Sequence, residues 1–148
     1  MATEIFKAVA KRKEGLAVEV EARGFKMTID EPEGLGGSNT GMNPVELLLG
    51  SIGACQTIVA TSFAPQFEID LQDFWVELEG DLDPDGFLGL NDEVSKGYQN
   101  IRFNFHIKSD ASEEKVKEFV EFIENTCPVG DTINSNLKLD AAKIIIEK

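Results

Sequence analysis

The sequence predicts an α+β protein. Apolar and polar residues alternate with period two in residues 4–30, 67–82 and 100–110, which is typical of strands. An apolar stretch at residues 43–63 and an amphipathic stretch at 113–127 predict two helices instead. The order of strands, helix, strands, helix and strands has no internal repeat, and 148 residues suit one domain covering residues 1–148.

Residues 4–30 are expected to form an antiparallel hairpin or meander. The segments EIFKAVAK, LAVEVEA and FKMTID alternate, and RKEG and Arg23-Gly24 provide turns between them. The following segment, EPEGLGGSNTGMNP, is rich in Gly and Pro and predicts a long loop. It lacks the glycine spacing of a phosphate-binding loop, so nucleotide binding is not expected.

The central helix is expected over residues 43–63, with Asn43 as N-cap and Pro44 at the first helical position. About twenty apolar residues would span a bilayer. Polar residues inside the stretch and the lack of flanking basic clusters favour a buried protein helix and no membrane contact. Because such a helix needs cover on every side, we expect an obligate homodimer in which two copies of it pack together. Small side chains suited to this contact are those of Gly50, Gly53 and Ala54.

The acidic segment from Asp81 to Asp92 partly matches the spacing of a calcium-binding loop. Asp81, Asp83, Asp85 and Gly86 occupy four positions of that pattern, but Asp92 stands where a bidentate Glu is needed. The flanking segments also alternate like strands rather than helices. An acidic, solvated turn is therefore the favoured interpretation, with weak cation binding as the alternative.

The last third of the chain is expected to contain a strand, a helix and further short strands. His106 falls on the polar face of strand 100–110, where an exposed or hydrogen-bonded histidine is favoured over a general base. Asp110 and Glu113 suggest a capping box for the second helix, whose apolar stripe continues to Cys127 before Pro128 ends it. The final segment, NLKLDAAKIIIEK, predicts one or two strands.

Charge and cysteine content exclude two classes of function. A net charge of −13 opposes binding to a nucleic-acid backbone, and without an apolar leader-like segment a cytoplasmic location is expected. Two cysteines and one histidine cannot complete a structural zinc site. Cys55 and Cys127 are therefore either redox-active or simply small buried side chains.

A nucleophilic Cys55 would need a nearby cation, because it lies in the middle of a helix, away from the helix terminus. Glu46 lies nine residues earlier, about 13 Å along the helix axis, and cannot touch it directly. An arginine between them would complete a three-part site.

Three segments together resemble the OsmC/Ohr family, specifically its OsmC-like branch. They are GGSNTGMNPVELLLGSIGACQ, GDLDPDGFLGLNDEV and CPVGDTI. The resemblance implies an intertwined homodimer in which antiparallel sheets wrap around buried central helices. It also implies a thiol-dependent peroxidase, an antioxidant enzyme of the oxidative stress response that reduces organic hydroperoxides.

The resemblance assigns a role to each candidate residue. Cys55 corresponds to the peroxidatic cysteine and Cys127 to the resolving cysteine, with which it forms a disulfide. Glu46 stands near the family's glutamate, although better-studied members carry Glu directly after the Pro, where this chain has Val45. Arg23 corresponds to the usual arginine of the OsmC-like branch, with Arg12 as the competing candidate.

The same resemblance implies an external dithiol or lipoyl-type reductant and no bound cofactor or metal. An alternative that the sequence leaves open is a non-catalytic member of the family. Such a protein would use its pocket to bind a small molecule or its cysteines to sense redox state.

Overall fold

The computed structural model describes residues 2–148, which divide into two compact units. The N-terminal unit extends to Gly50 and the C-terminal unit runs from Ser51 to Lys148. The boundary falls inside a continuous helix, α1 (Pro44–Phe63). Each unit is described by itself below, and the single-domain organisation remains a prediction.

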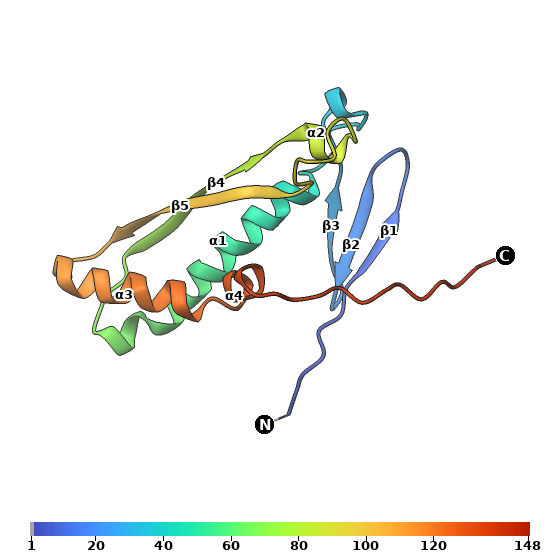
Figure 1. Cartoon of the computed structure of the whole chain (residues 1–148). Coiled ribbons are helices and arrows are strands. Elements are labelled where there is room, and N and C mark those ends of the chain that lie inside the picture. The colour runs from blue at the N-terminus through green and yellow to red at the C-terminus, as the bar shows by residue number, and fades with distance from the viewer. Residues whose placement is uncertain (1) are drawn as a thin grey trace. The chain divides into compact units, whose positions relative to one another are not determined.

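The N-terminal unit contains an antiparallel sheet in the order β1 (Val9–Arg12), β2 (Val18–Ala22) and β3 (Phe25–Ile29) (Figure 1). A two-residue turn joins β2 to β3, with positive φ at both Arg23 and Gly24. Such a turn matches the twist of the flanking strands. The meander is therefore confirmed, but the first strand is shorter than expected. Val9 pairs with Glu21 close to the end of β2, so residues 4–8 have no strand opposite them.

The loop after β3 folds around one carboxylate. Asp30 is 2% exposed and accepts hydrogen bonds from Glu31 N (2.8 Å), Ser38 N (3.3 Å), Thr40 N (3.1 Å) and Thr40 Oγ1 (2.6 Å). The Thr40 hydroxyl, with smaller contributions from the backbone donors, lowers the pKa of this carboxyl. The loop packs so tightly that a Cβ at Gly37 would collide with the Glu31 carbonyl. This long loop, which also contains the short helix η1 (Glu33–Leu35), is therefore a compact turn with an internal framework.

Helix α1 begins as predicted, with Asn43 as its N-cap. The Asn43 side chain accepts from Glu46 N (2.9 Å), and the Glu46 carboxylate accepts from Asn43 N (3.0 Å). This reciprocal pair is a capping box, which satisfies two donors at the start of the helix.

Together with η2 (Ala64–Phe67), α1 is long and apolar enough to cross a membrane by composition. Its second half nevertheless packs into a protein core through Val59 and Ala60. Gly53 also faces inward, since a Cβ there would lie 2.7 Å from Leu78 Cδ1 of strand β4. The close approach expected at Gly53 is therefore to this chain's own sheet. Gly50 meets open space on the same helix.

The C-terminal unit is built on a long antiparallel ribbon of β4 (Asp73–Leu82) and β5 (Tyr98–Lys108), joined through the short helix α2 (Pro84–Phe87) (Figure 1). The predicted alternation is confirmed, since Phe74 is buried and its neighbour Trp75 is exposed. Strand β4 begins at Asp73 rather than near residue 67, because Phe67 ends a 3-10 helix and residues 68–72 form the connection that follows it.

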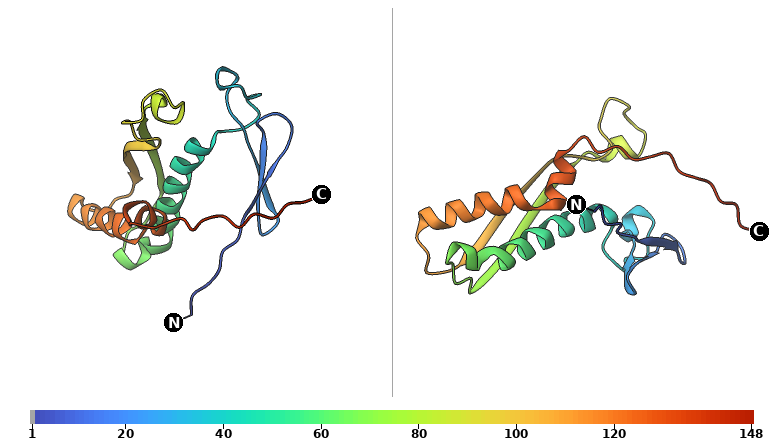
Figure 2. Two further views of the ribbon diagram at one scale, coloured as in Figure 1. Left: turned by 45° about the vertical axis from the view of Figure 1, so that its right-hand side comes forward. Right: turned by 90° about the horizontal axis from the view of Figure 1, so that it is seen from below.

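The second half of α1 and helix α3 (Glu113–Thr126) lie along the inner face of this ribbon (Figures 1 and 2). The core between them contains residues of α1, η2, β4 and α3 and the segment joining η2 to β4; these are Val59, Ala60, Ala64, Ile69, Phe74, Phe119 and Ile123. Helix α4 (Pro128–Asn134) follows α3 after one residue.

Two sequence predictions in this unit are wrong. The N-cap of α3 is Ser112, whose hydroxyl accepts from Lys115 N (3.3 Å), because Ser112 directly precedes the helix while Asp110 lies two residues too early. Residues 136–148, expected to form strands, have neither helix nor strand. A strand needs a partner for its backbone hydrogen bonds, and no strand of the described chain pairs with this segment.

Candidate active site

Cys127 lies in the single-residue break between α3 and α4. Its backbone N–H still donates to Ile123 O (3.1 Å), and its Sγ accepts from Gly130 N (3.3 Å) as the N-cap of α4. The side chain is 2% exposed and continues the buried stripe of Phe119 and Ile123, as predicted. Pro128 ends α3 and at the same time begins α4. The thiol is therefore held at a fixed point by local backbone geometry.

Cys55, in the C-terminal half of α1, is partly exposed and lies near Cys127. Both cysteines are free thiols, and they lie near enough to each other that Cys55 influences the pKa of the Cys127 thiol. Burial raises the pKa of the Cys127 thiol, and the hydrogen bond and charge of Cys55 raise it further, while the Gly130 N–H opposes them. Cys127 consequently remains a thiol at neutral pH. The fold thus brings together two cysteines that are 72 residues apart in sequence.

A cavity of about 370 Å³ opens beside Cys127. Its buried part is formed by Ile52, Gln56 and Cys127, and its walls by Ile101 and Phe103 of β5. The remaining lining residues are partly or largely exposed and come from the end of α3 and from α4; they are Glu124, Asn125, Gly130, Ile133 and Asn134. The cavity therefore combines a thiol with apolar walls and a polar rim, which suits a small, mainly apolar ligand.

Gln56 is a residue of this cavity that the sequence did not single out. It is 3% exposed, and its side-chain oxygen Oε1 is buried without a hydrogen-bond partner. In the sequence, Gln56 is one of the polar residues within 43–63 that oppose a membrane-spanning helix. The available signal was its position, one residue after Cys55 and one helical turn after Ile52, inside an otherwise apolar stretch.

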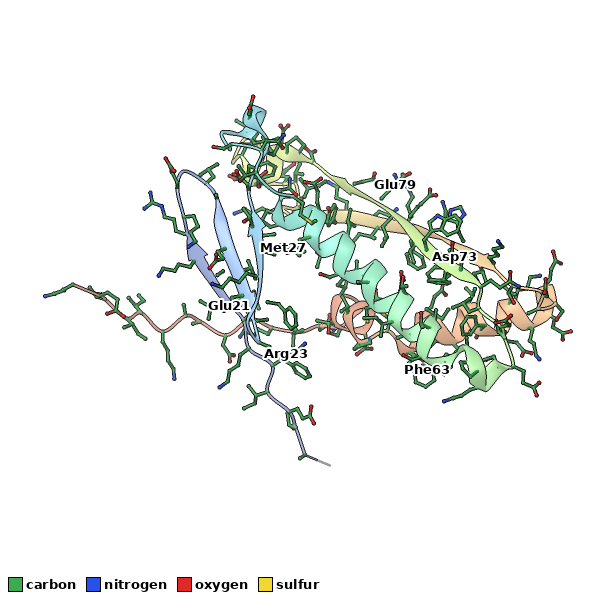
Figure 3. The ribbon with its side chains drawn as sticks, turned by 180° about the vertical axis from the view of Figure 1, so that it is seen from behind. Glu21, Arg23, Met27, Phe63, Asp73 and Glu79 are labelled. Carbon is green, nitrogen blue, oxygen red and sulfur yellow. The ribbon has the colours of Figure 1, made fainter. Side chains whose placement is uncertain are left out.

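Glu46, Arg23 and Arg12 belong to the N-terminal unit, so their role at the cysteines stays a prediction. The Glu46 carboxylate is used locally in the capping box of α1. Arg23 lies at the tip of the β2–β3 hairpin (Figure 3), is exposed, and stacks its guanidinium 5.3 Å from the Phe25 ring centre. Arg12 is the last residue of β1 and is also exposed.

His106 lies on the outer face of the ribbon, as predicted, opposite the face that lines the cavity. Its ring stacks on Trp75, with centres 4.6 Å apart and planes 2° from parallel, and its Nε2 lies 2.8 Å from Glu77 Oε1. Farther along the same face, where Figure 3 labels Glu79, Arg102 pairs with Glu79 and Asp81 at 2.8 Å. These contacts stabilise the outer face and give His106 a local structural role.

The segment from Asp81 to Asp92 does not gather its carboxylates around one point. Asp81 pairs with Arg102, and the Asp83 side chain caps α2 by accepting from Asp85 N (3.0 Å). Among residues 2–148 no group of three or more His, Cys, Asp or Glu side chains is arranged to hold a metal ion. The solvated, acidic turn is the interpretation that fits these contacts.

Comparison with known proteins relates this architecture to others. The profile of a family described as OsmC-like protein matches residues 36–142. A hydroperoxide reductase of Mycoplasma genitalium is 26% identical over 128 residues, covering 82% of this chain and 83% of that protein. A hydroperoxide reductase of Mycoplasma pneumoniae is 29% identical over 105 residues, covering 68% and 69%.

Solved structures agree with the fold. An OsmC-like protein from Mycoplasma pneumoniae superposes with a TM-score of 0.80 over 91% of each chain at 22% identity. An organic hydroperoxide resistance protein, OsmC, from Legionella pneumophila gives a TM-score of 0.68 at 23% identity, covering 92% of this chain and 93% of that one. The α+β fold predicted from the sequence is confirmed by these similarities.

Proposed function

The chain belongs to the OsmC-like protein family, and on that premise we propose that it is a thiol-dependent peroxidase that reduces organic hydroperoxides. The observation that carries the proposal is the proximity of Cys55 to Cys127, which itself lines a cavity with apolar walls. The two relatives named hydroperoxide reductase support a peroxide substrate. The apolar walls favour an organic hydroperoxide over hydrogen peroxide, because they bind an alkyl or aryl group.

In the proposed first step, the Cys55 thiolate attacks the terminal oxygen of the hydroperoxide. An S–O bond forms and the O–O bond breaks, so Cys55 becomes a sulfenic acid and the departing alkoxide takes a proton to leave as the alcohol. The peroxide gains the two electrons that the sulfur loses. Partial exposure of Cys55 gives the substrate access to the sulfur.

In the second step, Cys127 attacks the sulfenic sulfur. A disulfide forms, and the hydroxyl of the sulfenic acid takes the thiol proton and leaves as water. Because burial raises the pKa of Cys127, its thiol gives up the proton only as it attacks, and the departing hydroxyl accepts that proton. An external dithiol or lipoyl-type reductant then reduces the disulfide by two exchange steps and is itself oxidised.

A cation is proposed to stabilise the Cys55 thiolate. Arg23 is the first candidate and Arg12 the second, with Glu46 orienting the guanidinium. Arg23 is suited to this role because its guanidinium is exposed at a hairpin tip and lacks an ion-pair partner among the described contacts. A cytoplasmic location, where reduced thiols persist, is part of the same proposal.

A homodimer is also part of the proposal. The outward side of α1 carries Gly50, Ala54 and Ile58, and Ile58 is 66% exposed. Terminal segments expose further large apolar side chains, namely those of Ile5, Phe6, Leu137, Leu139 and Ile144–Ile146. A second copy would cover them and supply a strand partner for residues 136–148. Sedimentation equilibrium should give twice the 16.3 kDa chain mass; a monomer at micromolar concentration would contradict the dimer.

The proposed activity is tested by consumption of cumene hydroperoxide with a dithiol, using wild type, Cys55→Ser and Cys127→Ser. Cys55→Ser should lose all turnover. Cys127→Ser should accumulate a sulfenic acid that dimedone traps, and only wild type should form the intramolecular disulfide. A wild-type rate no faster than that of free dithiol would overturn the peroxidase.

The second candidate is a non-catalytic family member that binds a small molecule or senses redox state. The cavity beside Cys127, with its apolar walls, favours ligand binding as such. A thiolate titration discriminates between the two functions, because a peroxidase needs Cys55 ionised near neutral pH and a binding module does not.

A further inference from the structure

We propose that Glu124 is a specificity-determining residue, whose negative charge at the rim of the cavity disfavours anionic substrates and so selects uncharged organic hydroperoxides. The inference rests on the proposed peroxidase and narrows the class of its substrate. It begins from the charges of the cavity lining. Among the ten described residues that line the cavity, Glu124 is the only Asp, Glu, Lys or Arg.

The cavity has a buried part and an exposed rim, and these two ends would meet different ends of a substrate. Ile52, Gln56 and Cys127 are buried, whereas Glu124 and Asn134 are exposed and belong to the rim. A hydroperoxide must bring its O–O group toward the buried part, because the cysteine that resolves the reaction lies there. The opposite end of a substrate that fills the cavity therefore lies toward Glu124.

The charge of Glu124 is not balanced at the rim. Among residues 2–148 this side chain forms no ion pair, and no Lys or Arg lines the cavity. Glu124 lies in the last turn of α3, which has no basic residue and ends in carbonyl groups with partial negative charge. A glutamate is unfavourable at this end of a helix, so helix stability does not explain its presence. The next helix, α4, begins nearby with its positive end, but its first turn contains Asp131, which offsets that charge.

An unbalanced charge at the rim acts on a substrate through space and needs no hydrogen bond to it. Two like charges a few ångströms apart in a partly solvated site repel each other enough to weaken binding about fivefold at 0.1 M salt. The apolar walls of Ile101 and Phe103 bind the hydrocarbon part of a charged and an uncharged substrate equally well. Charge at the remote end of the substrate therefore decides between them, and the net charge of −13 acts in the same direction.

The kinetic test uses two substrates that differ in charge at the end remote from the hydroperoxide: cumene hydroperoxide with a para carboxylate, and the methyl ester of that acid. Glu124→Gln should raise kcat/KM for the acid relative to the ester by about fivefold, mainly through KM, and Glu124→Lys should raise it further. In 1 M salt most of this change should disappear. The matched control is Glu118→Gln, which removes the same charge from an exposed position of α3 outside the cavity lining and should leave the ratio unchanged.

Binding is measured separately, so that the charge effect is tested without turnover. NMR titration of the fully reduced protein gives the dissociation constants of 4-isopropylbenzoate and its methyl ester, which lack the peroxide group. Their ratio should shift by the same factor of about five in Glu124→Gln. An acid-to-ester ratio that is unchanged in Glu124→Gln, or that shifts equally in Glu118→Gln, would overturn the proposal. Absence of wild-type turnover together with the expected binding shift would instead overturn the peroxidase.

Discussion

Each of the two units contains a buried polar side chain, but only the one in the N-terminal unit has its oxygens satisfied by hydrogen bonds. In the N-terminal unit, Asp30 is 2% exposed and accepts four hydrogen bonds, three of them from backbone N–H groups. In the C-terminal unit, Gln56 is 3% exposed and its Oε1 accepts none. Asp30 organises the loop around it through these hydrogen bonds, whereas the Gln56 oxygen makes none with its own unit. A satisfied buried group indicates a structural role, whereas the unsatisfied Oε1 of Gln56 adds no hydrogen bond to the stability of its unit.

The two units are also stabilised by different interactions. The loop around Asp30 is held by directional hydrogen bonds and by close backbone packing at glycine. The C-terminal unit has an apolar core, in which Phe119 contacts Phe67 with ring centres 5.3 Å apart. The C-terminal unit is therefore stabilised mainly by apolar burial.

The largest loss of stability is expected in the apolar core of the C-terminal unit. Phe119 is fully buried, so Phe119→Ala should lower the free energy of unfolding by about 3–5 kcal/mol through lost burial and the cavity left behind. Chemical denaturation measures the loss. Phe87→Ala, the same change at a half-exposed position, should cost much less; equal losses would mean that the core is not what stabilises the unit.

A smaller loss is expected from crowding the loop around Asp30. Gly37→Ala should cost about 1–3 kcal/mol, because the new methyl group would collide with the Glu31 carbonyl and force the backbone to shift. Gly34→Ala is the matched control in the same loop, since a Cβ there meets nothing within 4 Å. Thermal melting that ranks Gly34→Ala as the more damaging change would contradict this packing.

The charge of Asp30 gives a pH dependence. Its hydrogen bonds, above all from the Thr40 hydroxyl, hold its pKa below the usual 3.8 in the folded state. The stabilisation is therefore fully present above that usual value and is lost as pH falls through the lowered folded pKa. Asp30→Asn should be less stable than wild type at pH 7, and the difference should shrink below about pH 4. Exposed Asp92→Asn should show no such convergence.

The smallest change in stability is expected at Gln56, in contrast to Asp30. Gln56→Met should leave the free energy of unfolding within about 1 kcal/mol of wild type or raise it, because it removes an unsatisfied oxygen from an apolar site. Urea titration of the reduced protein measures it. A loss as large as that of Phe119→Ala would show that Gln56 has a structural role after all.

Local rules in the sequence predicted much of the fold. Asn43 and Pro44 start α1, the alternation of Phe74 and Trp75 assigns the two faces of β4, and Cys127 continues the buried stripe of α3. Each depends on residues only a few positions apart. The N-cap of α3 was misplaced at Asp110 because Asp110 and Ser112 are both good capping residues, and only the backbone shows which of them directly precedes the helix.

The family motifs, the two candidate cysteines and the α+β order were all present in the sequence by itself. The proximity of Cys55 to Cys127, the unpaired oxygen of Gln56 and the inward packing of Gly53 against Leu78 were decided only by tertiary structure. The physical reason is that hydrogen-bond satisfaction and close packing depend on which distant segments meet. Residues 136–148 show the same limit: their alternation favours a strand, but a strand forms only where another backbone supplies its hydrogen bonds.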